Sequence, residues 1–84
     1  MRVVEQWRLL AGPEVFVTDA NVRFILQDRP CDWRGRRFEG LVSVEAYQME
    51  PPRKLGQALV PEGTPLEKWG AAIWGSRPPR GVRL

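Results

Sequence analysis

The chain has 84 residues, enough for one domain, and 43% of them are hydrophobic, which is typical of a folded globular protein and argues against a disordered one. Lysine and arginine number 13 against 10 aspartates and glutamates, a net charge of +3. This excess lies in the last nine residues, which contain Arg77, Arg80 and Arg83 and no acid. We therefore expect a neutral compact domain over residues 1–75 and a basic, mobile tail over residues 76–84.

The N-terminal third predicts three short strands. Residues 2–10 have a spacing that fits either a helix or a strand, and we favour a strand. Residues 14–18, EVFVT, are rich in β-branched and aromatic side chains and predict a second strand. Residues 22–27, VRFILQ, would return antiparallel after a turn. The alternative for this last stretch is a short helix that begins at Asp19 as N-cap.

The stretch 38–49, FEGLVSVEAYQM, predicts the central strand of the fold. Val42, Val44 and Ala46 alternate with more polar residues, which gives an extended chain one apolar face. The prolines at positions 51 and 52 end the strand, because proline cannot donate a hydrogen bond to a neighbouring strand. A helix is the alternative, and we favour the strand.

The C-terminal third predicts a short edge strand over residues 57–60, after a turn at Gly56, and then a helix. The sequence Thr64-Pro65-Leu66-Glu67 matches a capping box with proline at the first helical position. Leu66, Trp69 and Ile73 follow as an apolar stripe with helical spacing. The expected fold is α+β: an antiparallel sheet of four or five short strands, which could close into a barrel, with one C-terminal helix packed on it.

Residue types needed for most catalysis and metal binding are missing. The chain has no histidine and one cysteine, Cys31, so it can form no internal disulfide, no histidine-dependent catalytic site and no common zinc site. No apolar run approaches the ~18 residues of a membrane span. We expect a cytoplasmic, non-catalytic protein that binds no metal, cofactor, membrane or small-molecule substrate.

A loop over residues 28–37, DRPCDWRGRR, is the strongest candidate binding site. It combines one tryptophan with four arginines, as in proteins that stack bases and pair phosphates of single-stranded nucleic acid or RNA. In the alternative interpretation, Trp33 anchors the loop in the core and two aspartates offset half the charge. The tail could add phosphate contacts, and Trp74, off the apolar stripe, could contact a partner. The candidate residues are Arg29, Trp33, Arg34, Arg36, Arg37, Trp74, Arg77, Arg80 and Arg83.

The function we favour is a small binding module for nucleic acid or a nucleoprotein complex. The alternative is a protein-interaction module, such as a small inhibitor or accessory subunit that docks on a larger protein, which the four tryptophans would suit. A third alternative comes from residues 51–69, PPRKLGQALVPEGTPLEKW. This stretch resembles the wing and following helix of prophage excisionases, with matches at Lys54, Leu55, Gly56, Val60 and Trp69. That resemblance implies a winged-helix DNA-binding protein with its recognition helix over LVSVEAYQ.

Overall fold

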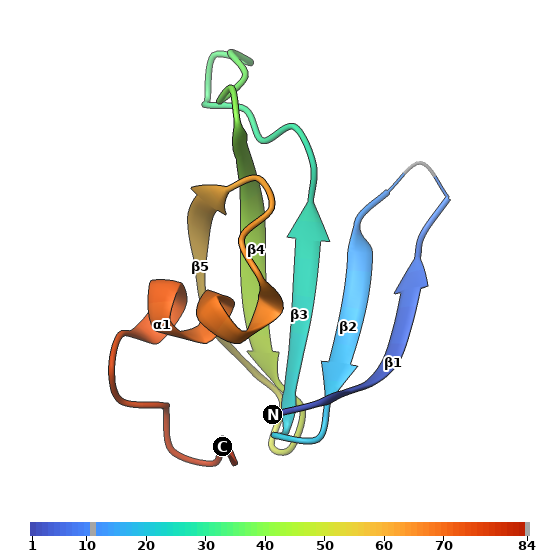
Figure 1. Cartoon of the computed structure of the whole chain (residues 1–84), viewed down its shortest axis with the longest axis vertical. Helices are drawn as coiled ribbons and strands as arrows, with labels where there is room; N and C mark the ends of the chain where they lie inside the picture. The colour runs from blue at the N-terminus through green and yellow to red at the C-terminus, as the bar shows by residue number, and fades with distance from the viewer. Residues whose placement is uncertain (11, 84) are drawn as a thin grey trace.

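A computed structural model describes residues 1–10 and 12–83 as a five-stranded antiparallel sheet with one short helix packed on it (Figure 1). Each strand pairs with the next one in the sequence, in the order β1-β2-β3-β4-β5. The sheet is not closed, so it is not a barrel. The elements are β1 (Val3–Arg8), β2 (Glu14–Thr18), β3 (Val22–Gln27), β4 (Leu41–Gln48), β5 (Arg53–Pro61), the 3-10 turn η1 (Leu66–Lys68) and α1 (Trp69–Trp74).

The α+β prediction is confirmed, and so is the choice of strand in each ambiguous stretch. Residues within 2–10 form β1, and residues 22–27 form β3 instead of a helix that begins at Asp19. Residues 41–48 are strand β4, so the recognition helix that an excisionase-like winged helix requires is not formed. The resemblance of residues 51–69 to that family therefore does not extend to the fold.

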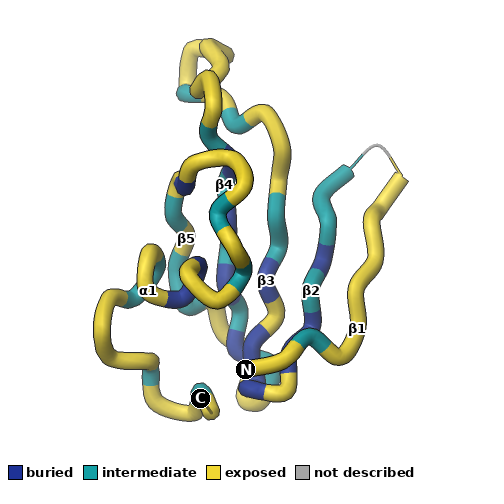
Figure 2. The backbone as a smooth tube through the Cα atoms, viewed as in Figure 1, coloured by how far each residue is buried: buried dark blue, intermediate teal, exposed yellow. Residues whose placement is uncertain are grey.

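The core lies between α1 and the central strands. On β4, Val42, Val44 and Ala46 are buried and alternate with half-buried residues, as the period of two predicts (Figure 2). Phe24 of β3 lies opposite Ala46 and is fully buried. Trp69 of α1 covers these residues, with its ring edge-on to Phe24 at a centroid distance of 5.6 Å. The apolar faces of β3 and β4 and the helix thus form one cluster.

Two details of the C-terminal third were predicted wrongly. Gly56 is not a turn: β5 runs through it, and the pairing with β4 slips there because Ala46 pairs with Gly56 while Tyr47 pairs with Lys54. Leu55 is therefore the extra residue of a bulge. The bulge lets β5 be longer than the expected edge strand.

The predicted capping box is not formed. Thr64 donates its hydroxyl hydrogen to the carbonyl oxygen of Pro61 at 2.6 Å instead of accepting from the helix. The chain enters η1 from Pro65 without a side-chain cap, and α1 starts only at Trp69. The expected stripe is still present, with Trp69 buried and Leu66 and Ile73 packed beside it.

The described part of the tail folds back on the sheet near the β2–β3 turn. The backbone N–H of Arg83 donates to the carbonyl oxygen of Ala20 at 2.9 Å. The side-chain amide of Asn21 donates to Gly81 at 3.2 Å and to Glu50 at 2.7 Å. Val82 packs against the core cluster. The boundary at residue 75 and the mobility of the tail stay predictions.

Candidate nucleic-acid interface

The connection between β3 and β4 extends the two strands into a small second hairpin at one end of the molecule (Figure 1). We call residues 29–38 the tip hairpin. Cys31 and Arg37 form an isolated antiparallel bridge, and the N–H of Asp32 donates to the carbonyl oxygen of Arg36 at 2.8 Å. The N–H of Phe38 donates to Pro30 at 2.9 Å. The connection is therefore a hydrogen-bonded structure and not an irregular loop.

Asp32 holds the turn of the tip hairpin together. Its carboxylate accepts hydrogen bonds from the backbone N–H groups of Arg34 at 2.8 Å and Arg36 at 2.9 Å, and from Nε of Arg36 at 2.9 Å. Gly35, with φ at +80°, closes the turn by donating to the carbonyl oxygen of Asp32 at 3.0 Å. The backbone hydrogen bond from Arg36 lowers the pKa of Asp32, because it favours the ionised carboxylate.

Trp33 projects from this turn into solvent. Its exposed fraction is 85%, so the alternative in which Trp33 anchors the loop in the core is wrong. The guanidinium carbon of Arg34 lies over the indole ring, 4.5 Å from its centroid. An exposed tryptophan on an ordered turn offers a flat apolar surface at small entropic cost.

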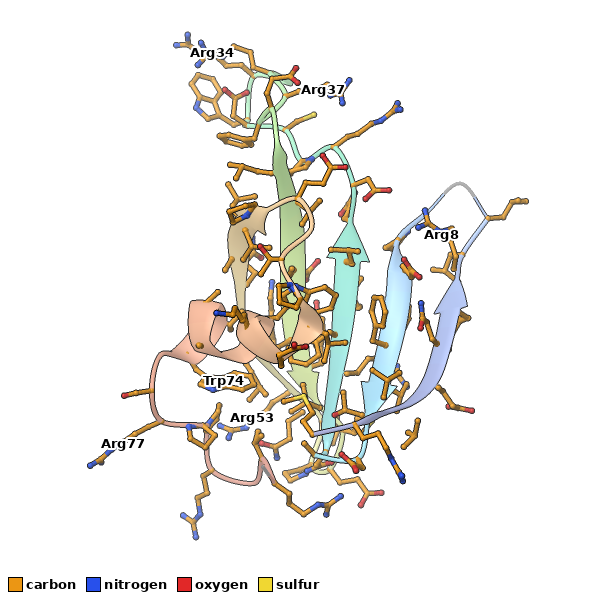
Figure 3. The ribbon with its side chains drawn as sticks, in the orientation of Figure 1. Arg8, Arg34, Arg37, Arg53, Trp74 and Arg77 are labelled. Atoms are coloured by element: carbon orange, nitrogen blue, oxygen red, sulfur yellow. The ribbon has the colours of Figure 1, made fainter. Side chains whose placement is uncertain are left out.

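The four arginines of the tip hairpin do not have equal roles. Arg36 is paired with Asp32, so it stabilises the turn and its charge is offset. Arg29, Arg34 and Arg37 take part in no ion pair in the described part of the chain. In Figure 3 Arg34 and Arg37 extend outward from the end of the molecule. Three unpaired guanidinium groups therefore accompany the exposed indole.

Acidic residues gather at the base of the tip hairpin and not at its end. A polar cleft of about 330 Å³ lies there, and its lining includes Asp28, Glu39 and Glu62 next to Arg29 and Arg37. These carboxylates lower the positive potential at the base.

The structure separates Trp74 and the tail from the tip hairpin. Trp74 is half-buried, and its ring stacks on Phe24 at a centroid distance of 6.3 Å, so it contributes to the core. Arg77 lies at the end of the molecule opposite Arg34 (Figure 3). The carbonyl oxygen of Arg80 accepts a hydrogen bond from Arg53 at 2.7 Å. Arg83 is held to the β2–β3 turn, where its backbone N–H donates to Ala20 and its guanidinium to the carbonyl oxygen of Asp19. The nine candidate residues therefore form two groups at opposite ends of the molecule.

The role of Asp32 in this turn differs from its sequence interpretation, in which its charge only offsets those of the arginines. The available signal was the spacing Asp32-Trp33-Arg34-Gly35, since an aspartate three residues before a glycine is typical of a turn in which the carboxylate accepts backbone hydrogen bonds.

Comparison with models of known protein families, with curated proteins and with solved structures gave no match. Within residues 1–10 and 12–83, no cluster of cysteine, aspartate or glutamate has the arrangement needed to hold a metal ion. No helix in that part of the chain is long and apolar enough to cross a membrane. Conclusions about function therefore depend on the geometry of the molecule itself.

Proposed function

We propose that this protein is a non-catalytic module that binds single-stranded nucleic acid, free or in a nucleoprotein complex, through the tip hairpin. The observation that carries the proposal is the 85% exposed fraction of Trp33 on a turn that Asp32 fixes. Unpaired bases stack on aromatic side chains, and each such contact contributes about 1–3 kcal/mol. Arg34 covers one face of the indole, which leaves the other face for a base.

The arginines support the same proposal. Arg29, Arg34 and Arg37 carry no carboxylate partner, so phosphate groups can pair with them without breaking an ion pair of the protein. Pairing with phosphates releases counterions, which makes affinity fall as salt rises. With two or three contacts the dependence on salt should be moderate. The arginines of the tail lie at the other end of the molecule and would act only on a longer strand.

Binding of a fluorescently labelled oligothymidine tests the proposal. Trp33→Ala should weaken binding at least fivefold, because it removes the stacking surface. Arg34→Ala together with Arg37→Ala should weaken binding and reduce its dependence on salt. Arg77→Ala is the matched control, since it removes the same charge far from the tip hairpin and should have a smaller effect on a short strand.

Each variant should keep the circular dichroism spectrum of the wild type, because the substituted side chains are exposed or unpaired. A folded Trp33→Ala variant that binds the oligonucleotide as tightly as the wild type refutes this function. So does binding by the wild type that is independent of salt.

Docking on a larger protein is the second candidate, and the exposed apolar side chains of the β1–β2 hairpin favour it. Val4 and Leu9 are 50% and 49% exposed, and Leu10 is fully exposed. Within residues 1–10 and 12–83, β1 pairs with β2 and with no other strand, so its outer edge can bind another strand. Co-purification of a protein that resists moderate salt and is lost on Leu9→Glu would support this function.

A further inference from the structure

One stretch of the outermost strand, β1, has the regular geometry that a further strand needs for pairing (Figure 1). From Glu5 onward β1 keeps an unbroken register with β2, after a shift that precedes this residue. The N–H of Leu9 donates to the carbonyl oxygen of Pro13 at 3.0 Å and continues the same ladder. The side chains from Glu5 to Arg8 are all exposed. We call residues 5–9 the β1 edge.

The hydrogen bond of Leu9 also fixes which backbone groups of the β1 edge point away from β2. In an antiparallel pair, successive residues direct their N–H and C=O groups alternately toward the neighbouring strand and away from it. Leu9 points toward β2, so Trp7 does too, while Gln6 and Arg8 point outward. Within the described residues β1 has no strand on that outer side. Gln6 and Arg8 therefore offer two donors and two acceptors to a further strand.

Two apolar side chains of the β1 edge lie on the face of the sheet that α1 does not cover. Trp7 pairs with Val15, whereas the next residue of β2, Phe16, contacts Trp69 of α1 from the other face. Leu9 shares the face of Trp7, and their exposed fractions are 49% and 39%. A strand added to the β1 edge would cover part of both side chains.

The β1 edge is complementary to itself. If two copies pair antiparallel with Trp7 opposite Trp7, then Gln6 of each copy lies opposite Arg8 of the other. These two pairs use the outward groups and can form four backbone hydrogen bonds. The Trp7 pair is then of the non-hydrogen-bonded kind, with Cα atoms about 4.5 Å apart, in which cross-strand side chains are closest. Aromatic pairs of this kind stabilise a sheet. Glu5 of each copy lies opposite Leu9 of the other.

The charges of the β1 edge permit this pairing. The two copies of Arg8 would lie diagonally across from each other. Each is bonded to Glu14 of its own chain at 3.0 Å and lies 3.6 Å from Asp28, so its charge is already offset. Glu5 is exposed and would stay at the rim of the contact, in water.

The other edge of the sheet is less suited to pairing. β5 has a bulge at Leu55 and ends at Pro61, which has no N–H to donate. Pairing of β1 with β5 of another copy would also leave an unpaired edge at each end and so continue without limit. Pairing of β1 with β1 uses the same surface on both copies and closes at two.

We propose that two copies of this chain form a dimer in which their β1 edges pair antiparallel about a two-fold axis at Trp7, joining the two sheets into one. An edge this short belongs to the small class of interfaces, below about 1,200 Å². We therefore expect a weak dimer that forms at roughly 10 μM to 1 mM protein. It occupies the edge used for docking in the second candidate function, so the two exclude each other, and it does not involve the tip hairpin.

Sedimentation velocity over this concentration range tests the proposal with two variants of Gln6. Gln6→Pro removes the outward N–H, and proline is tolerated on an edge strand where the N–H faces solvent. It should weaken dimerisation at least tenfold, because by symmetry half of the backbone hydrogen bonds between the copies are lost. Gln6→Ala is the matched control, since it keeps the N–H and should dimerise like the wild type. Trp33→Ala, at the other exposed indole, should also leave the dimer unchanged.

Two variants of Leu9 test the register and decide the question if Gln6→Pro does not fold. Leu9→Lys places an ammonium group opposite Glu5 of the second copy, and Leu9→Glu places a carboxylate there. Opposite charges across strands attract and like charges repel, and the pair occurs twice, so Leu9→Glu should dimerise at least fivefold more weakly than Leu9→Lys. Net charge alone would give the reverse order, since the chain carries +3.

A chain that stays monomeric up to about 1 mM overturns the inference. A dimer that forms equally well in both Leu9 variants, or in Gln6→Pro and Gln6→Ala alike, also overturns it, because the contact then lies elsewhere. Growth into larger assemblies would overturn it in favour of head-to-tail pairing. A monomer that binds another protein through the β1 edge would overturn it in favour of docking. None of these results depends on nucleic-acid binding, so the function of the tip hairpin is tested separately.

Discussion

Gly56→Ala is expected to destabilise the contact between α1 and β5. A Cβ atom at this position would lie 2.9 Å from Cγ2 of Ile73, at least 0.5 Å closer than the 3.4 Å at which ordinary contacts begin. The backbone of Gly56 also has φ at +144°, a value that residues other than glycine rarely adopt. The substitution therefore introduces both a steric overlap and backbone strain.

The two effects have separate magnitudes. Overpacking against a well-packed neighbour costs about 1–3 kcal/mol. The unfavourable φ adds about 1–2 kcal/mol. The free energy of unfolding should thus fall by roughly 2–5 kcal/mol, and for a domain of this size each kcal/mol corresponds to about 4–8 °C in Tm.

Urea unfolding of a small set of variants separates the overlap from the strain. Gly63→Ala is the matched control, because φ there is +87° and nothing lies within 4 Å of the new Cβ. It should show the strain alone. Ile73→Ala removes Cγ2 and with it the overlap. The double variant Gly56→Ala with Ile73→Ala should therefore lose less free energy of unfolding than the two single variants lose together, by about 1 kcal/mol or more.

Strict additivity of the two substitutions would show that Gly56 and Ile73 are not in contact and would refute the reasoning. Equal losses in Gly56→Ala and Gly63→Ala would lead to the same conclusion. Either result would mean that α1 does not pack closely on β5 at Gly56.

Trp69→Ala removes a buried ring and should lower the free energy of unfolding by about 3–5 kcal/mol, measured in urea, and a loss below 1 kcal/mol would contradict its place in the core. The pKa of Asp32 is lowered mainly by the backbone hydrogen bond from Arg36, so this contribution to stability is present above the ordinary value of 3.8 and is lost as pH falls through the lowered one. The amide signal of Arg36 in NMR spectra should move over that acid range, and a signal that stays in place would disprove the bond. The pKa of Tyr47 is raised mainly by its hydrogen bond to Glu45, so this contribution is present below pH 10.0 and is lost as pH rises through the raised value. Glu45→Gln should return the phenol titration, followed by absorbance, toward 10.0.

The strands could be predicted because their burial follows the simplest sequence pattern. On β4, Val42, Val44 and Ala46 occupy alternate positions, and one face of the sheet is buried. The exposed position of Trp33 could not be predicted, since a tryptophan in a polar loop fits burial and exposure equally well. The local hydrogen bonds of Asp32 decide it, because they stabilise a turn that needs no contact with the core.

The bulge at Gly56 and the pairing of Arg23 with Tyr47 depend on contacts between distant parts of the chain. An isolated glycine shortly after two prolines fits a turn, and only the approach of Ile73 from α1 explains why Gly56 lies within a strand. Arg23 and Tyr47 are far apart in sequence, and alone they are an ordinary exposed and an ordinary half-buried strand residue. Their register across β3 and β4 brings them together.

The tip hairpin has one property with a practical consequence. Its turn is held by hydrogen bonds between residues at most four positions apart, all of them supplied by Asp32, Arg34, Gly35 and Arg36. A turn held by such local hydrogen bonds should form in another protein as well. Residues 29–38, grafted between two antiparallel strands of an unrelated scaffold, should keep the same turn. The graft should then present the same indole and guanidinium groups and bind single-stranded nucleic acid through them.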